Sequence, residues 1–299
     1  MKKLLLFALL LSAAAPAVAQ APAIRYGWAP KPALIAPYVA PNRAIWRLAD
    51  LQKAHANDQR WSQVAVRDPI GLTGTYIQSA PGDVSQRVLY SDSTIFFVVQ
   101  SGQLRVLIDG VEPFIATKGF LVQVPSLRYF HVETVSDAPA LRFEVTQTRS
   151  LPYYTVDETP APVPGRKYER AIYYGNPIPY GNRKPFIDFQ KDIVSGGLDG
   201  SGLVRDDYIA ADIDRSPAGP RPPANERGHF HLGSELWLVL EGQVDYQIEG
   251  ARAFTAQQGD VIFAPTGRWH RLTSGGTGAA ATVSARPVHE SLSAVDQVR

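Results

Sequence analysis

The sequence predicts an all-β fold, mainly β-strand with few short helices, in which two β-barrels of similar build follow one another. Two observations support this prediction. The 299-residue chain contains 24 prolines and 24 glycines, spread along its length, which interrupt long helices and suit many short strands joined by turns. The chain also repeats itself at an offset of 140 residues, so one pattern of strands and turns occurs twice.

Residues 1–19 are predicted to be a secretory signal peptide. A basic start at Lys2 and Lys3 precedes an apolar stretch, and small residues end at Ala19. A membrane anchor is the alternative, but it needs about 20 apolar residues, and Pro16 comes too early for that. No arginine pair precedes the apolar stretch, so we expect Sec-type export to a periplasmic or secreted location, with no membrane insertion of the mature chain.

The amino-acid composition limits which side chains can bind a metal or act as nucleophiles, and which partners the protein has. The chain has no cysteine, so disulfides, thiolate ligands and cysteine nucleophiles are excluded, and a metal site must use His, Asp or Glu. Loss of Lys2 and Lys3 with the signal leaves equal numbers of basic and acidic side chains. A neutral mature chain argues against nucleic acid as the main partner.

The repeat defines the predicted domains. Residues 98–110 align with residues 238–250, and in both segments apolar side chains alternate as in a strand with one buried face. The turn residues that match at the same offset are Gly102 with Gly242, Gly110 with Gly250, Gly119 with Gly259, and Pro125 with Pro265. The predicted division is a proline-rich N-terminal segment (20–42), a first barrel (43–150), a proline-rich, extended linker (151–170) and a second barrel (171–299).

Four side chains of the second half form a candidate metal site. His229, His231 and Glu235 have the same parity, so they project to one side of a regular strand. The strand at 261–264 and its following turn lead to His270, which can complete the set. Three imidazoles and one carboxylate suit one divalent transition metal ion with a position open to water or substrate. Histidines that line a barrel without metal are the alternative.

These residues carry a family resemblance. The segments His229-x-His231-x3-Glu235-x6-Gly242 and Gly259-x5-Pro265-x-Gly267-x2-His270 resemble the two motifs of the cupin superfamily. The resemblance implies two tandem cupin-type jelly-roll barrels, a bicupin, with His229, His231, Glu235 and His270 as the metal ligands. Two positions depart from the pattern. Pro223 replaces a turn glycine, and Glu226 stands where oxalate-acting bicupins usually carry an arginine, which disfavours an oxalate substrate.

The first half lacks the ligands. At the same offset, Leu89, Ser91, Ile95 and Phe130 replace His229, His231, Glu235 and His270, and His131 is one residue out of register. Leucine and isoleucine cannot ligate a metal, so residues 43–150 are predicted to be a degenerate, metal-free cupin domain.

Several further residues are candidates for a substrate pocket or for proton transfer. Trp237, Phe263 and Leu272 are predicted to line the pocket, and Arg268 to bind a substrate carboxylate. Tyr208 and Glu226 are candidate catalytic groups for proton transfer. Each has a structural alternative, because aromatic residues inside a barrel are usually core and charges beside a strand usually face solvent.

Three functions remain open. The first is a mononuclear-metal oxygenase or dioxygenase acting on a small aromatic or organic-acid substrate. The second is a metal-dependent lyase, decarboxylase or isomerase, and the third is a non-catalytic protein that binds a small molecule. Copper, iron, zinc, nickel and manganese all suit the donor set, and outside the cytoplasm copper and zinc compete most strongly for it. Because cupin sheet edges often pair between chains, a homodimer is also possible.

Overall fold

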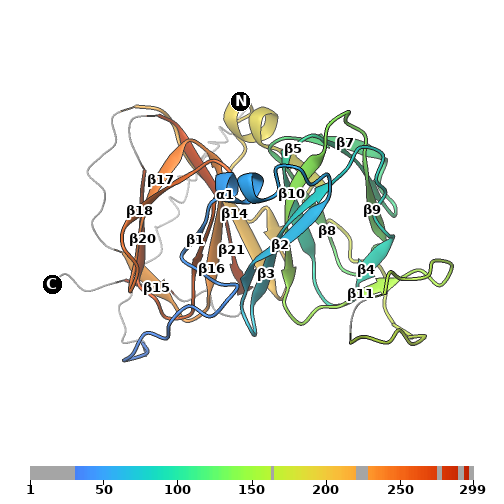
Figure 1. Ribbon diagram of the computed structural model, residues 1–299, viewed down its shortest axis with the longest axis horizontal. Coiled ribbons are helices and arrows are strands. Elements are labelled where there is room, and N and C mark those ends of the chain that lie inside the picture. The colour runs from blue at the N-terminus through green and yellow to red at the C-terminus, as the bar shows by residue number, and fades with distance from the viewer. Residues whose placement is uncertain (1–30, 163–164, 220–227, 275–277, 289–292, 296–299) are drawn as a thin grey trace, which may run out of the picture. The chain divides into compact units, whose positions relative to one another are not determined.

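The computed structural model describes residues 31–162, 165–219, 228–274, 278–288 and 293–295. The predicted signal peptide therefore lies outside the described residues. The described chain is built mainly of strands, which form four antiparallel sheets (Figure 1), and this confirms the all-β prediction. Its helices are the short α1 (Leu48–Ala54) and the π-helical η1 (Phe189–Ser195). Neither of these is long and apolar enough to cross a membrane.

The first barrel consists of two sheets. The six-stranded sheet has the order β12 (Phe186–Asp188), β8 (Phe120–Val124), β5 (Ile95–Ser101), β10 (Ala140–Gln147), β3 (Leu72–Ser79) and β2 (Trp61–Arg67). The five-stranded sheet has the order β11 (Pro152–Tyr154), β4 (Val88–Tyr90), β9 (Phe130–Thr134), β6 (Gln103–Ile108) and β7 (Phe114–Thr117).

The second barrel repeats this arrangement. Its six-stranded sheet has the order β1 (Ile45–Trp46), β19 (Val261–Ala264), β16 (Glu235–Glu241), β21 (Ala280–Pro287), β14 (Ile209–Ser216) and β13 (Val204–Arg205). Its five-stranded sheet has the order β18 (Phe254–Gln257), β17 (Gln243–Ile248), β20 (His270–Ser274), β15 (His229–His231) and β22 (Ser293–Val295).

Alternation along β5 and β16 explains where the cores lie. On β16, Trp237 and Val239 pack inside the second barrel, whereas Leu236 and Leu238 pack in a cluster that both barrels share. Strand β5 divides its side chains between the first barrel and the shared cluster in the same way. Because both faces of these strands are buried, their sequences are almost continuously apolar. The large sheets of the two barrels therefore share one hydrophobic core.

The glycines of the repeat occupy equivalent turns. Gly102 follows β5 and Gly242 follows β16, and their φ angles are +75° and +67°. Side-chain-bearing residues rarely adopt this left-handed conformation. At Gly242 a Cβ atom would also lie 2.0 Å from the Ala279 carbonyl oxygen. Glycine is thus required at this turn by both conformation and space.

The two halves exchange their short lead-in strands. Strand β1 precedes the first barrel in sequence but pairs with β19 of the second, with Ile45 opposite Ile262. Strand β12 precedes the second barrel and pairs with β8 of the first. The predicted division into 43–150 and 171–299 therefore does not describe the hydrogen bonding of the sheets. The prediction that residues 151–170 form an extended linker is also wrong at its start. Residues Pro152–Tyr154 form strand β11, which pairs with β4 of the first barrel.

The described part of the proline-rich N-terminal segment, residues 31–42, lies along the second barrel. The Tyr38 hydroxyl donates a hydrogen bond of 2.8 Å to the Phe263 carbonyl oxygen. Lys31 forms a 2.7 Å ion pair with Glu249. Prolines prevent this segment from forming a sheet ladder, so side chains supply its attachment.

Candidate metal centre

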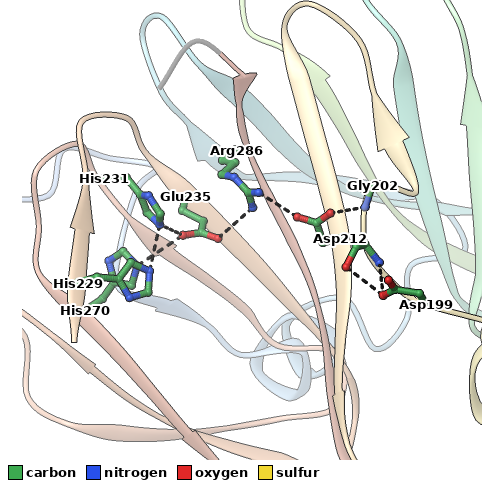
Figure 2. Close-up of polar contacts among 9 residues, drawn as sticks. Asp199, Gly202, Asp212, His229, His231, Glu235, His270 and Arg286 are labelled. Carbon is green, nitrogen blue, oxygen red and sulfur yellow. Dashed lines mark hydrogen bonds and ion pairs between the residues drawn. The ribbon is translucent and has the colours of Figure 1, made fainter. Parts of the chain in front are cut away.

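Four potential metal ligands converge where β15, β16 and β20 meet (Figure 2). His229 and His231 lie on β15, Glu235 begins β16 and His270 begins β20. His229 and His270 are paired directly across β15 and β20, so their imidazoles leave the sheet on the same face. One ligating atom from each of the four residues lies within 4.8 Å of the others. These residues form a possible metal site, as predicted.

Glu235 reaches the site by a different route from the predicted one. Parity counting assumed one regular strand through residues 229–235, but β15 ends at His231 and β16 begins at Glu235 in the other sheet of the barrel. The chain changes sheets within the three intervening residues. The carboxylate therefore approaches the imidazoles from the facing sheet, which gives a three-dimensional donor set.

The donor atoms fit a divalent transition metal. Glu235 Oε2 lies 2.7 Å from His231 Nε2 and 3.4 Å from His270 Nε2. Nevertheless, within the described chain Glu235 Oε2 and His270 Nε2 are buried without an aligned hydrogen-bond partner. Burial of such atoms without a partner costs free energy. Three imidazole nitrogens and one carboxylate oxygen are suitable ligands for an ion that would satisfy them.

A backbone contact orients His270. Its Nδ1 atom lies 3.0 Å from the Arg268 carbonyl oxygen, which can only accept a hydrogen bond. Nδ1 therefore carries the proton when this bond forms in the neutral ring, and Nε2 is left with a lone pair directed at the other ligands.

Burial and mutual contact favour the protonation states that bind metal. Burial, with further contributions from His270 and His231, lowers the pKa of His229 from 6.5 to about 4. Burial alone raises the pKa of Glu235, but its contacts with His231 and His270 outweigh this effect and lower the pKa to about 2. At neutral pH the His229 imidazole is neutral and the Glu235 carboxylate is ionised, as ligation requires.

The predicted pocket residues divide between two faces. The Trp237 ring meets the His270 ring edge-on, with centroids 4.9 Å apart, and Leu272 packs against the same interior cluster. Phe263, by contrast, packs in the cluster shared by the two barrels, while its neighbours Ile262 and Ala264 face the interior with Trp237. The prediction that Phe263 lines the pocket is therefore wrong.

Arg268 was predicted to bind a substrate carboxylate, but its side chain makes structural contacts within the protein. Its guanidinium donates to the carbonyl oxygens of Glu249 and Ala36 and lies 4.2 Å above the Tyr38 ring. These contacts hold the N-terminal segment against the second barrel. The predicted role of Arg268 in binding a carboxylate substrate is corrected accordingly.

The two candidate proton-transfer residues remain predictions. Tyr208 precedes β14, and its side chain is 41 % exposed. Its backbone N–H donates a 2.7 Å hydrogen bond to Asp206 Oδ1. Glu226 lies outside the described residues.

The first barrel has core residues at the equivalent positions. Leu89, Ile95 and Phe130 are buried in the first half and pack as ordinary apolar side chains. His131 lies 3.7 Å from Glu133 and is not part of a ligand cluster. In the described chain, the second barrel holds the one group of His and carboxylate residues close enough to share an ion.

Sequence reasoning missed Arg286 on β21. Its Nη1 atom lies 4.0 Å from Glu235 Oε1, and its Nη2 atom lies 3.0 Å from Asp212 Oδ2. The repeat contained a signal for it, because the residue 140 positions earlier is the uncharged Thr146. The charge therefore occurs only in the half that has the ligands.

Comparison with known proteins agrees with the fold and the motifs. Residues 221–285 match the model of the family described as "Cupin domain". A comparison with curated proteins gives no match. Among solved structures, salicylate 1,2-dioxygenase from Pseudaminobacter salicylatoxidans superposes with a TM-score of 0.57 at 12 % identity, over 81 % of this chain and 82 % of that chain.

The same dioxygenase, described as adducts with gentisate, superposes with a TM-score of 0.55 at 13 % identity, over 81 % of this chain and 80 % of that chain. At this identity the likeness shows the fold alone. The family match and the two motif-bearing strands identify residues 221–285 as a cupin domain. Since two barrels of this build follow one another, the chain has the architecture of a bicupin, and its described residues hold one candidate metal centre, in the second barrel.

Proposed function

We propose that this bicupin is a mononuclear-metal oxygenase of the dioxygenase type that acts on a small aromatic or organic-acid substrate. The donor set of three histidines and one glutamate in the second barrel carries the proposal. Of the four ligands, Glu235, His231 and His270 are buried, whereas His229 is partly exposed. A substrate or water molecule would therefore approach from the side of His229.

The residues of the site have separable tasks. A bound divalent ion supplies Lewis acidity and, if it is copper, iron, nickel or manganese, a route to chemistry with dioxygen. His270, oriented by the Arg268 carbonyl group, and the ionised Glu235 hold the ion in place. The buried Trp237 ring packs edge-on against the His270 ring and lines that side of the site.

The similar structures guide the choice of test substrates. Their names associate the same fold with salicylate and gentisate, which are aromatic acids. Such compounds are suitable test substrates, because the candidate ligands lie beside an apolar interior in which the Trp237 ring contacts His270.

Oxygen consumption tests this proposal. The purified protein is loaded separately with copper, iron, nickel, manganese or zinc and given salicylate, gentisate, other phenols or small organic acids. Under the oxygenase hypothesis, at least one redox-active metal supports oxygen uptake that matches substrate loss, and zinc does not. Absence of oxygen uptake with every redox-active metal counts against the proposal.

A lyase, decarboxylase or isomerase is the second candidate. This candidate is supported by the donor set, because three imidazoles and one carboxylate are suitable ligands for zinc and also for a redox-active ion. Substrate turnover without oxygen, supported by zinc, would identify this function. Binding of a substrate without any turnover would instead indicate a binding protein.

Export is a further part of the proposal and rests on the sequence of residues 1–19. The test is mass spectrometry of the protein's N-terminus after cell fractionation. Export predicts a chain that begins at Gln20 in the periplasmic or secreted fraction. An intact N-terminus confined to the cytoplasm would contradict it.

A further inference from the structure

Glu235 has two carboxylate oxygens with different surroundings. Oε2 faces His231 and His270, on the side where a metal would bind. Oε1 faces Arg286 at a distance of 4.0 Å from Nη1 (Figure 2). One oxygen of the ligand is therefore directed to the imidazoles, while the other meets a guanidinium group.

Arg286 is itself held in place from behind. Its Nη2 atom forms a 3.0 Å ion pair with Asp212 Oδ2, and the side chains of Arg286 and Asp212 are 25 % and 19 % exposed. The other oxygen of Asp212 accepts a 2.6 Å hydrogen bond from the backbone N–H of Gly202. Figure 2 shows the resulting series from Gly202 through Asp212 and Arg286 to Glu235. The carboxylate of Asp212 thus bridges a backbone donor and the guanidinium.

Sheet order places these residues together. Arg286 lies on β21, opposite Ala210 of β14, and Asp212 lies two residues further along β14, opposite Ser284. Strand β16 pairs with the other edge of β21, with Leu236 opposite Ala285, so Glu235 lies beside Arg286. The contact depends on three adjacent strands and not on a mobile surface side chain.

The first barrel lacks this arrangement. The place of Arg286 is taken by Thr146 at the 140-residue offset. In the first barrel Glu144 corresponds to Ser284, and its partner on β3 is Thr75, so Thr75 takes the place of Asp212. The barrel without metal ligands therefore has two threonines where the barrel with ligands has an ion pair.

We infer that Arg286 and Asp212 are a positioning pair for the metal ligand Glu235. Arg286 holds Oε1, so that Oε2 stays directed at the imidazoles, and Asp212 fixes Arg286 and compensates its charge. The inference rests on the proposed metal binding at this site. Partners of this kind behind a metal ligand typically change metal affinity by about 10- to 100-fold.

The test has to separate two effects of Arg286 on metal affinity, namely its positive charge and its positioning of Glu235. Removal of Arg286 alone takes a positive charge away from a cation site, which by itself favours metal binding. We therefore choose the double variant Arg286→Gln with Asp212→Asn, which leaves the net charge unchanged. The matched control is Arg215→Gln with Glu241→Gln, which removes a 3.0 Å ion pair at the opposite end of β16 from Glu235.

The probe is Co²⁺, whose visible absorption reports the number and geometry of its ligands. Affinity is measured by titration, and the spectrum is recorded at saturation, both in the full-length protein. We expect the double variant to bind Co²⁺ about 10- to 100-fold more weakly than wild type and with shifted absorption bands. The control variant should match wild type in both measurements. The thermal unfolding midpoint without metal verifies that both variants are folded.

Unchanged affinity and an unchanged spectrum in the folded double variant would overturn the inference while leaving the metal site intact. Equal losses in the control variant would also overturn it, because they would show a general effect of destabilisation. If wild type itself does not bind Co²⁺, the proposed metal site fails together with the inference. If the double variant does not fold, Arg286→Lys replaces it, because a single ammonium nitrogen then takes the place of the two guanidinium nitrogens that separately meet Asp212 and Glu235. Weaker binding in that variant supports the inference, and wild-type binding overturns it.

Discussion

Two buried tyrosines differ in whether their hydroxyl groups are bonded. Tyr76 and Tyr246 are both fully buried. The Tyr76 hydroxyl donates a 2.6 Å hydrogen bond to the Gly259 carbonyl oxygen, so it joins the first barrel to the second. The Tyr246 hydroxyl, inside the second barrel, has no hydrogen-bond partner among the described residues.

Replacing each tyrosine by phenylalanine tests this difference. Tyr76→Phe should lower the free energy of unfolding by about 1–3 kcal/mol, because it leaves a buried carbonyl oxygen unpaired. Tyr246→Phe should leave it unchanged or raise it slightly, since no bond is lost. Denaturant unfolding of the two variants measures both effects. Equal losses would contradict the assigned hydrogen bond.

At the same scale, the sequence allowed prediction of the four ligands but not of their surroundings. His229, His231, Glu235 and His270 stand out because the first half of the repeat has mostly apolar residues in their places. The sequence could not show which face of β19 Phe263 occupies. All four residues of this strand are apolar and buried, so there is no alternation of polar and apolar residues to distinguish its two faces. Arg286 was missed because strand order, and not sequence spacing, brings it beside Glu235.

At the scale of elements, the turns after β5 and β16 were predictable from glycine. The sharper prediction concerns Gly242, where an added Cβ atom would lie 2.0 Å from the Ala279 carbonyl oxygen. Gly82 is a matched control, with a φ angle of +78° and no atom within 4 Å of an added Cβ. Both substitutions carry the conformational cost of the left-handed region, and only Gly242→Ala adds a collision with backbone.

Gly82→Ala should therefore cost about 1–2 kcal/mol of unfolding free energy, which is the usual conformational cost. Gly242→Ala should cost clearly more, because the turn must shift to relieve the contact. Unfolding in urea, with the slope of the transition checked for each variant, provides the comparison. Similar costs for the two variants would mean that the turn after β16 is not packed as described.

The exchange of strands β1 and β12 between the two barrels could not be predicted from the sequence. Strand β1 lies just before the first barrel in the sequence, and β12 lies just before the second. The sequence could not show that β1 and β12 each join the sheet of the other half, because a short apolar strand fits either sheet edge equally well. Long-range packing decides the partner, and no local pattern records it.

At the scale of the whole molecule, the two barrels should unfold together. Their large sheets share one apolar cluster, which includes Phe96 and Phe143 from the first barrel and Leu238 and Val283 from the second. Separation would expose this cluster and break the β1 and β12 pairs. We therefore expect the two barrels to unfold in a single cooperative transition, although each has its own pair of sheets.

Native-state hydrogen exchange tests this cooperativity. Peptides that cover β5 and β16 should exchange through openings of the same free energy. Metal bound in the second barrel should slow exchange in both strands equally, because it stabilises the shared native state. Earlier exchange of β5, unaffected by metal, would show that the first barrel opens independently.

Metal content is the measurement that tests the central claim most directly. Elemental analysis of the purified protein, before and after reconstitution with copper, iron, zinc, nickel or manganese, should find about one divalent ion per chain, as expected for a single centre. The ion should be lost in His231→Ala, which removes a buried ligand, and retained in His131→Ala, which alters only the first barrel. Absence of near-stoichiometric metal in wild type after reconstitution, or its loss in His131→Ala but not in His231→Ala, would contradict the assignment.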